Sequence, residues 1–339
     1  MGGNALKKTT TRRYSAKEYL ALRNQVIRKL QPLLPDCAMD DIKHYRQKPD
    51  FGDLDILIED KDTKNRLINR LSDISEISEL VTHHENSPVW SAGWGDFQVD
   101  LIFAEPNYYD FTSRYFAYND LGNLIGRVAH HMGFKFGSKG LIYVLMDGDF
   151  KIGEITVTLD FEDALTFLGF GNKAHSEHQE GFDTLEEMFE YISESYYFEP
   201  NFYRLETRSN SASARDRKRP IYQAFLRHIE GMLSFSNTLD KDEHLHRAFA
   251  FFASFKGDHD NLLLSHEISL IFKARFNGEM VSRITGLKHI ELGRLMEKLR
   301  AGFADKLALQ QWVLNNSDQV IEDWVLKLKN ELMQLSCQE

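Results

Sequence analysis

Strand-like stretches are confined to the part of this sequence before about residue 160, and that asymmetry limits the folds open to the chain. Short apolar runs bounded by turn residues are typical of buried strands, whereas apolar residues at every third or fourth position are typical of helices. Because strands and helices are segregated along the chain, we expect an α+β fold with a mixed sheet, followed by an all-helical C-terminal region. The predicted strands are residues 53–58, 97–103, 141–147 and 152–159, with a hairpin-like stretch over 83–95. The predicted helices are 15–31, 61–79, 120–132 and 160–169, followed from Thr184 by helices with breaks near 199–220, 236–241, 256–260 and 277.

This pattern predicts three segments. Residues 1–40 form a basic helical segment that packs on the sheet-containing part, residues 41–175 form the central domain, and residues 176–339 form the helical C-terminal domain. The first helix has a clear start, because Ser15 and Glu18 have the spacing of a capping box. Pro32 marks its end.

The charge of the chain is acidic overall and uneven along its length. With 41 Lys and Arg against 51 Asp and Glu, the net charge is −10, which argues against a protein that coats duplex DNA by bulk electrostatics. Residues 1–30 nevertheless carry eight Lys and Arg against Glu18, and residues 204–219 carry six against Glu206 and Asp216. These segments are either solvated, flexible stretches or places that hold phosphate groups.

Neither membrane nor secretory features stand out in the sequence. It has no run of 18 apolar residues, and its basic beginning lacks the apolar stretch of a secretory signal. Two cysteines, Cys37 and Cys337, cannot form a disulfide framework. We therefore expect a cytoplasmic protein without a membrane partner.

Three aspartates occur inside apolar, strand-like runs. Asp53 and Asp55 lie two residues apart, so their carboxylates point to the same face of a strand, and Asp100 lies between Val99 and Leu101 in a second strand. Ionised carboxylates in core strands are costly unless something pairs with them, and a divalent metal bound by hard oxygen ligands relieves their mutual repulsion. We predict that the three bind two Mg²⁺ ions, with Mn²⁺ as a substitute. The alternative is that they stand apart at strand ends, exposed or capping.

The stretch from Tyr45 to Ile58, YRQKPDFGDLDILI, resembles the signature of the DNA polymerase beta-like nucleotidyltransferase superfamily, and Val99-Asp100-Leu101 is similar to the segment of its third metal carboxylate. The likeness covers residues 42–170. It implies a nucleotidyltransferase domain in which the first two aspartates hold both metals, and the third binds the catalytic metal and helps to activate the 3′-hydroxyl.

The same resemblance suggests which residues bind the nucleotide. The stretch after the third aspartate looks like that of family X polymerases, where a Tyr-Phe pair packs on the sugar and later polar residues meet the base. Gly52 would offer a backbone amide to the triphosphate, and Arg46 would neutralise its charge. The implied nucleotide-binding set is Arg46, Gly52, Tyr115, Phe116, Asp120, Asn123 and Arg127.

The sequence also departs from the family pattern. The Gly-Ser or Gly-Gly pair that usually precedes the first aspartate is replaced by Ile42-Lys43-His44, so Lys43 or Lys48 would have to compensate. The usual hinge glycine after Tyr-Phe is replaced by Ala117-Tyr118. The segment from Gly133 to Gly140 is glycine-rich and favours a turn, with phosphate contact as the alternative.

Several features bear on the acceptor. The basic residues Arg215, Arg217, Lys218 and Arg219 follow the aromatic stretch 196–203, which either packs between domains or stacks bases. Residues 276–296 are similar to a tail motif of tRNA nucleotidyltransferases, with a plain helix-turn-helix as the alternative. We therefore expect transfer of a nucleoside monophosphate from a nucleoside triphosphate to a hydroxyl, first of all an RNA or DNA 3′ end, with release of pyrophosphate. The alternatives are a protein or small-molecule acceptor, which the net acidity favours, and a binding module without turnover.

Overall fold

The computed structural model describes residues 5–71, 73–82, 87–234 and 239–336, and it divides the chain into two compact units. Unit 1 comprises Met1–Val144 and Glu154–Lys256, and unit 2 comprises Leu145–Gly153 and Gly257–Glu339. The predicted boundary between residues 175 and 176 falls inside unit 1. His83, His84 and Cys337, which the sequence analysis covers, lie outside the described residues.

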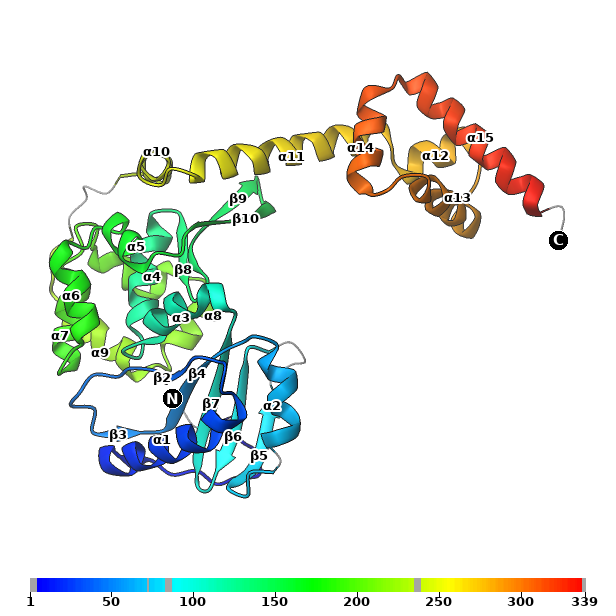
Figure 1. Ribbon diagram of the computed structural model, residues 1–339. Helices are drawn as coiled ribbons and strands as arrows, with labels where there is room; N and C mark the ends of the chain where they lie inside the picture. Colours follow the sequence, from blue (N-terminus) through cyan, green and yellow to red (C-terminus); the bar gives the residue numbers. More distant parts are fainter. Residues whose placement is uncertain (1–4, 72, 83–86, 235–238, 337–339) are drawn as a thin grey trace. The chain divides into compact units, whose positions relative to one another are not determined.

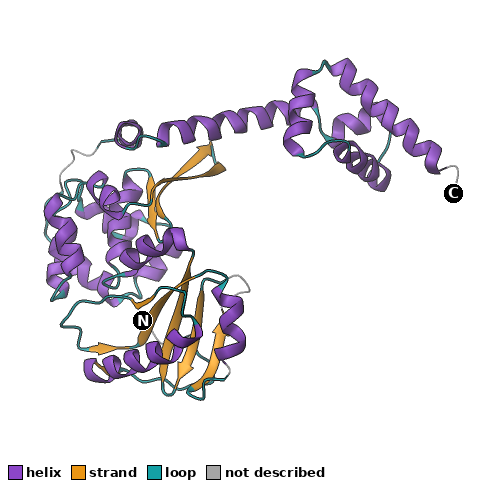
Figure 2. Ribbon diagram, viewed as in Figure 1, coloured by secondary structure: helices purple, strands orange, loops and turns teal. Residues whose placement is uncertain are grey.

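The fold class is confirmed. The last strand of the described chain ends at Thr158, and the regular elements after it are helices (Figures 1 and 2). The strands are β1 (Tyr14–Ser15), β2 (Met39–Asp41), β3 (Asp50–Phe51), β4 (Asp53–Glu59), β5 (Ile77–Thr82), β6 (Val89–Trp94), β7 (Phe97–Ala104), β8 (Phe134–Gly137), β9 (Gly140–Asp147) and β10 (Phe150–Thr158). The helices before residue 200 are α1 (Ala16–Leu30), α2 (Thr63–Leu71), α3 (Tyr109–Phe116), α4 (Leu121–His131), α5 (Phe161–Phe167), α6 (Asn172–Glu180) and α7 (Leu185–Ser193). The later helices are α8 (Asn210–Asp216), α9 (Pro220–His228), α10 (Lys241–Phe251), α11 (Phe255–Arg275), α12 (Gly278–Thr285), α13 (His289–Ala301), α14 (Lys306–Asn315) and α15 (Asp318–Ser336).

The five-stranded sheet of unit 1 has the order β2-β4-β7-β6-β5, in which β4 and β7 are parallel and the other neighbours are antiparallel. Side chains alternate along each strand, so one face of β4 and β7 is apolar and forms a core with α1 and α2. Helix α1 begins with the predicted capping box of Ser15 and Glu18. Residues that meet in this core include Val26, Leu54, Ile56, Val99 and Leu101.

Four local expectations are wrong. The predicted break at 199–220 contains α8, because the Ser209 side chain caps this helix by accepting from the N–H of Ala212. The predicted helix 61–79 ends at Leu71, and Ile77–Thr82 instead forms β5, because pairing with β6 overrides the local helical pattern. The predicted turn 133–140 contains β8, in which Phe134 and Phe136 are buried in alternation with the exposed Lys135. The predicted break at 256–260 lies inside α11, where Gly257 is tolerated within a long helix.

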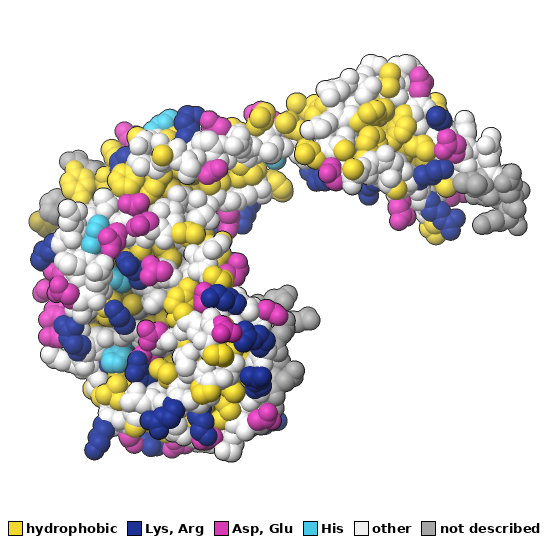
Figure 3. All heavy atoms as spheres, viewed as in Figure 1, with side chains coloured by type: hydrophobic (Ala, Val, Ile, Leu, Met, Phe, Trp, Pro, Cys, Tyr) yellow, Lys and Arg dark blue, Asp and Glu magenta, His cyan; other side chains and the backbone are white. Residues whose placement is uncertain are grey.

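Unit 2 contains a bundle of helices with its own core. Val281, Leu295, Val313 and Ile321 are fully buried there. Helices α12 and α13 are joined through Gly286, whose positive φ of 72° ends α12 in the left-handed conformation. Residues 276–296 therefore form a helix-turn-helix, and their similarity to a tail motif of tRNA nucleotidyltransferases stays a prediction. Figure 3 shows apolar side chains, in yellow, on the surface of this unit. Leu264 on α11 and Ile290 on α13 are among its exposed apolar residues.

None of the helices in the described part of the chain combines the length and apolarity that crossing a bilayer requires.

Candidate functional site

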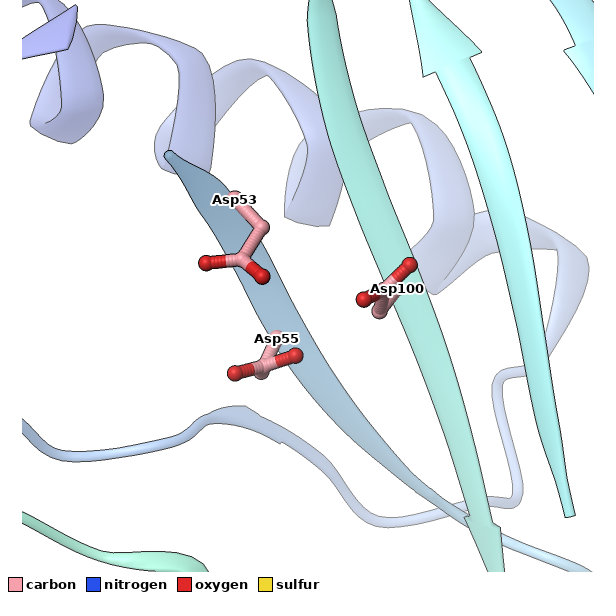
Figure 4. Close-up of side chains that lie close together, drawn as sticks. All are labelled: Asp53, Asp55 and Asp100. Atoms are coloured by element: carbon pink, nitrogen blue, oxygen red, sulfur yellow. The ribbon is translucent and has the colours of Figure 1, made fainter. Parts of the chain in front are cut away.

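The parallel pairing of β4 and β7 brings the three predicted aspartates together (Figure 4). Asp55 lies directly opposite Asp100 in the register, and Asp53 projects from the same face of β4 two residues earlier. One carboxylate oxygen from each of the three lies within 4.8 Å of those of the other two. The predicted convergence is confirmed, and the alternative of three separate strand-end residues is excluded.

The electrostatics of this group, which we call the Asp triad (Asp53, Asp55 and Asp100), favour a bound cation. Burial raises the pKa of Asp55 well above its usual value, and the negative charges of Asp53 and Asp100 raise it further. A divalent cation between the three carboxylates would offset this repulsion. Because the donors are hard carboxylate oxygens from rigid strands, they could hold a metal ion, and they suit Mg²⁺ or Mn²⁺.

A cavity of about 570 Å³ opens onto Asp53 and Asp55. A smaller cavity of about 120 Å³ shares Asp53, Asp55, Lys48 and Asn119 with it and also contacts Phe116. Cations line the larger cavity as well as carboxylates, so it could receive a polyanion bound through metal ions. They are Arg13, Lys48 and Arg219.

Lys48 is the cation most closely tied to the Asp triad. Its Nζ lies 4.6 Å from the centroid of the Phe51 ring, which holds the side chain over the start of β4. Burial lowers the pKa of Lys48, while the charges of Asp53 and Asp55 raise it. A partly desolvated ammonium group in this position can pair with a phosphate.

Three of the predicted nucleotide-binding residues line the cavities: Gly52 and Asp120 contact the larger one and Phe116 the smaller one. Asp120 also has a role that the sequence analysis missed. It accepts a hydrogen bond of 2.7 Å from Nη1 of Arg219, which holds that guanidinium at the cavity. A residue predicted to bind nucleotide is thereby paired with one predicted to bind nucleic acid.

Two predicted nucleotide-binding arginines are engaged by the protein itself. Arg46 forms an ion pair with Asp183 and donates from Nη1 to the carbonyl of Glu180 at 2.9 Å. Arg127 is buried and donates to the carbonyl of Phe202 at 3.0 and 2.8 Å. Neither belongs to the described lining of the two cavities.

The other two residues of the nucleotide-binding set are placed by α3 and α4. The ring of Tyr115 packs against those of Phe116 and Phe136, with centroid distances of 5.2 and 5.7 Å. The amide nitrogen of Asn123 is buried, and the described structure provides no hydrogen-bond partner for it. Their predicted contacts with the sugar and base stay predictions.

The basic stretch 204–219 is part of unit 1 and is anchored in it by a buried ion pair. Asp216 at the end of α8 is fully buried and forms an ion pair with Arg208, whose side chain is 5% exposed. This pair anchors the turn that follows α8. Arg217 and Lys218 in this turn are exposed, and the next residue, Arg219, lines the larger cavity. Arg215 also contacts the Asp216 carboxylate, at 3.3 Å.

Asn119 is a site residue that the sequence analysis missed. It lines both cavities, and it follows Tyr118 in a pair of left-handed residues with φ of 60° and 63°. Tyr118 is held there because its N–H donates to the carbonyl of Lys43 at 2.7 Å and its hydroxyl donates to that of His178 at 2.9 Å. The available signal was Asn119 itself, since Asn tolerates this conformation better than most residues.

A scan of this chain against protein-family models finds no match, and a search of curated proteins finds no significant match. The function of this chain is therefore inferred from the geometry of the site.

Proposed function

We propose that this chain is a divalent-metal-dependent nucleotidyltransferase, similar to the DNA polymerase beta-like superfamily. It would transfer a nucleoside monophosphate from a nucleoside triphosphate to an acceptor hydroxyl. The observation that supports this most strongly is the Asp triad, two of whose members, Asp53 and Asp55, line a cavity of about 570 Å³. The same cavity is lined by the cations Lys48, Arg13 and Arg219. Phosphoryl transfer requires carboxylates that bind metal ions next to basic side chains that bind phosphate groups.

In this proposal the acceptor oxygen bonds to the α-phosphorus while the bond from that phosphorus to the pyrophosphate oxygen breaks. Bound divalent ions would stabilise the charge on the phosphate oxygens and increase the acidity of the hydroxyl. Asp53 and Asp55 would hold both ions, and Asp100 would bind the catalytic one and help to take the hydroxyl proton. Lys48 and Arg219 would neutralise charge on the triphosphate, and Phe116 would contact its sugar.

The decisive experiment incubates the purified chain with each labelled nucleoside triphosphate, Mg²⁺ or Mn²⁺, and panels of DNA, RNA and protein acceptors. We expect label transfer and pyrophosphate release from the wild type. Asp100→Asn should lower the rate of label transfer about 10³-fold or more, because bound metal ions supply several kcal/mol of transition-state stabilisation. Asp73→Asn, a change of an exposed aspartate, is the matched control. Metal-dependent triphosphate binding without pyrophosphate release would instead identify a binding module.

We further propose a nucleic-acid 3′ end as the acceptor. Arg219 lines the cavity, and Arg217 and Lys218 extend the positive charge from it onto the surface. Replacing Arg215, Arg217, Lys218 and Arg219 together by Ala should weaken nucleic-acid binding and flatten the dependence of log Kd on log salt concentration. Unchanged affinity and slope would favour a protein or small-molecule acceptor.

A further inference from the structure

The stretch Ala5–Thr9 is seated on the edge of the five-stranded sheet by unusually specific contacts. The carboxylate of Glu79 on β5 accepts three backbone hydrogen bonds, from the N–H groups of Lys7 at 3.1 Å, Lys8 at 2.9 Å and Thr9 at 3.0 Å. The hydroxyls of Thr9 and Ser78 lie 2.9 Å apart. A carboxylate that receives three amides in succession fixes the path of the backbone, since each bond is directional.

Gly93 on β6 leaves the space for this stretch. A Cβ atom at this position would approach the hydroxyl oxygens of Thr9 and Ser78 to 2.7 Å, closer than Cβ atoms pack. In the sheet register Gly93 lies opposite Glu79 on one side and opposite Gln98 of β7 on the other. Because Gly93 has no side chain, the stretch Ala5–Thr9 can pass over this position toward Gln98.

The crossing ends in a hydrogen-bond chain that reaches the Asp triad. The N–H of Ala5 donates to Oε1 of Gln98 at 2.9 Å. Nε2 of Gln98 in turn donates to both carboxylate oxygens of Asp100, at 2.9 and 3.0 Å. Because a backbone N–H can only donate and an ionised carboxylate can only accept, the two partners together fix which end of the amide faces Asp100.

We propose that Gln98 is the positioning residue of Asp100, and that docking of Ala5–Thr9 sets its orientation. This inference rests on the proposed function in that it treats Asp100 as a metal ligand. The amide donors stabilise the ionised carboxylate beside Asp55 and hold it on the face where the triad meets. Gln98 also lies opposite Asp53 in the register. Without the Ala5 donor, the amide can rotate and turn its oxygen toward Asp100, which repels that carboxylate.

The sharpest test removes one backbone hydrogen-bond donor from the chain. Ala5→Pro deletes the N–H that donates to Gln98, and Ala5→Ser keeps it as the matched control. Gln98→Met removes the amide at nearly constant size, and Glu79→Ala removes the acceptor that seats the stretch. The measurement is the affinity for Mn²⁺ alone, from the electron paramagnetic resonance signal of free Mn²⁺, with the full-length chain in every case.

We expect Ala5→Pro and Gln98→Met to weaken Mn²⁺ binding about 10-fold or more, the usual cost of losing a group that orients a metal ligand. Glu79→Ala should act in the same direction, and Ala5→Ser should match the wild type. In turnover assays, kcat should fall at an unchanged KM for the triphosphate. Mn²⁺ affinities within twofold of the wild type for both Ala5→Pro and Gln98→Met would overturn the inference.

The failure of this inference differs from a failure of the proposed function. If the wild type transfers nucleotide and both variants bind Mn²⁺ normally, the inference alone is wrong. If the wild type transfers no nucleotide but Mn²⁺ affinity falls in both variants, the positioning role holds and the proposed reaction is wrong. If the wild type binds no Mn²⁺, both are overturned.

Discussion

Two places in unit 1 bring charged side chains together, and they do so in opposite ways. Arg208 and Asp216 are buried as a pair of opposite charges, and the Arg208 guanidinium also lies 5.4 Å from the centroid of the Tyr222 ring. The Asp triad instead gathers three charges of the same sign, and burial together with that repulsion raises the pKa of Asp55.

The difference separates a structural group from a functional one. A buried pair of opposite charges neutralises its own charge, so it can anchor the basic turn without any ligand. Like charges close together on neighbouring strands lower the stability of the fold. Binding of a ligand of opposite charge restores the lost stability. Net charge within a cluster of side chains therefore indicates function better than burial alone. Mutations at both places test this distinction.

Breaking the Arg208–Asp216 pair should be the most damaging change. Asp216→Ala leaves the buried Arg208 without its partner, and we expect a loss of about 3–5 kcal/mol in the free energy of unfolding. Urea denaturation measures it, with the exposed Asp73→Ala as the control, expected within about 0.5 kcal/mol of the wild type. A loss below about 1 kcal/mol for Asp216→Ala would mean that the pair does not anchor this region.

The two candidate phosphate-binding cations should differ in their effect on turnover. Lys48 lines the cavities, so Lys48→Met should lower kcat/KM about 10- to 100-fold, equivalent to a charged hydrogen bond of about 1.5–3 kcal/mol. Arg46 is engaged by Asp183 and Glu180, so Arg46→Met should change kcat/KM by less than about threefold. The reverse ranking would assign the triphosphate contact to Arg46, as the sequence resemblance implies.

Removing one charge from the Asp triad should stabilise the metal-free protein. Because the pKa of Asp55 is raised, its ionised form costs stability at neutral pH, and Asp55→Asn should gain about 0.5–2 kcal/mol in EDTA. Mn²⁺ should raise the Tm of the wild type by mass action and leave that of Asp55→Asn nearly unchanged. Thermal unfolding with and without Mn²⁺ measures both effects. A destabilised Asp55→Asn in EDTA would show that the triad is not under electrostatic strain.

His178 differs from both the ion pair and the Asp triad, because it is a titratable side chain that is buried in its neutral form. Burial lowers its pKa to about 3, and the positive charges of Arg114 and Lys43 act in the same direction. The unfolded chain takes up this proton near pH 6.5 and the folded chain does not, so stability falls as the pH drops from about 6.5 toward 3. Between pH 6.5 and 5.5 we expect the wild type to lose about 1 kcal/mol more than His178→Phe. The exposed His246→Gln should follow the wild type, and an identical pH slope for His178→Phe would contradict this account.

The sequence predicted the parts of this fold that depend on short-range pattern. The apolar alternation around Asp53 and Asp55 and around Asp100 indicated both central strands, and the Ser15 capping box located the start of α1. Periodicity was not enough for β5 and β8, because their pairing with strands elsewhere in the chain overrides weak local signals.

The order of residues is enough to establish which chemistry is available: two carboxylates on one face of a strand and a third in another apolar strand. Which groups meet these carboxylates depends on the folded chain. The parallel register set Asp55 opposite Asp100, the fold gave the cavity Lys48 and Arg219 while it engaged Arg46 and Arg127 elsewhere, and Ala5 reached Gln98 across the sheet. The physical reason is that side-chain alternation is a local property of a strand, whereas pairing between groups far apart in the chain depends on how the whole core packs.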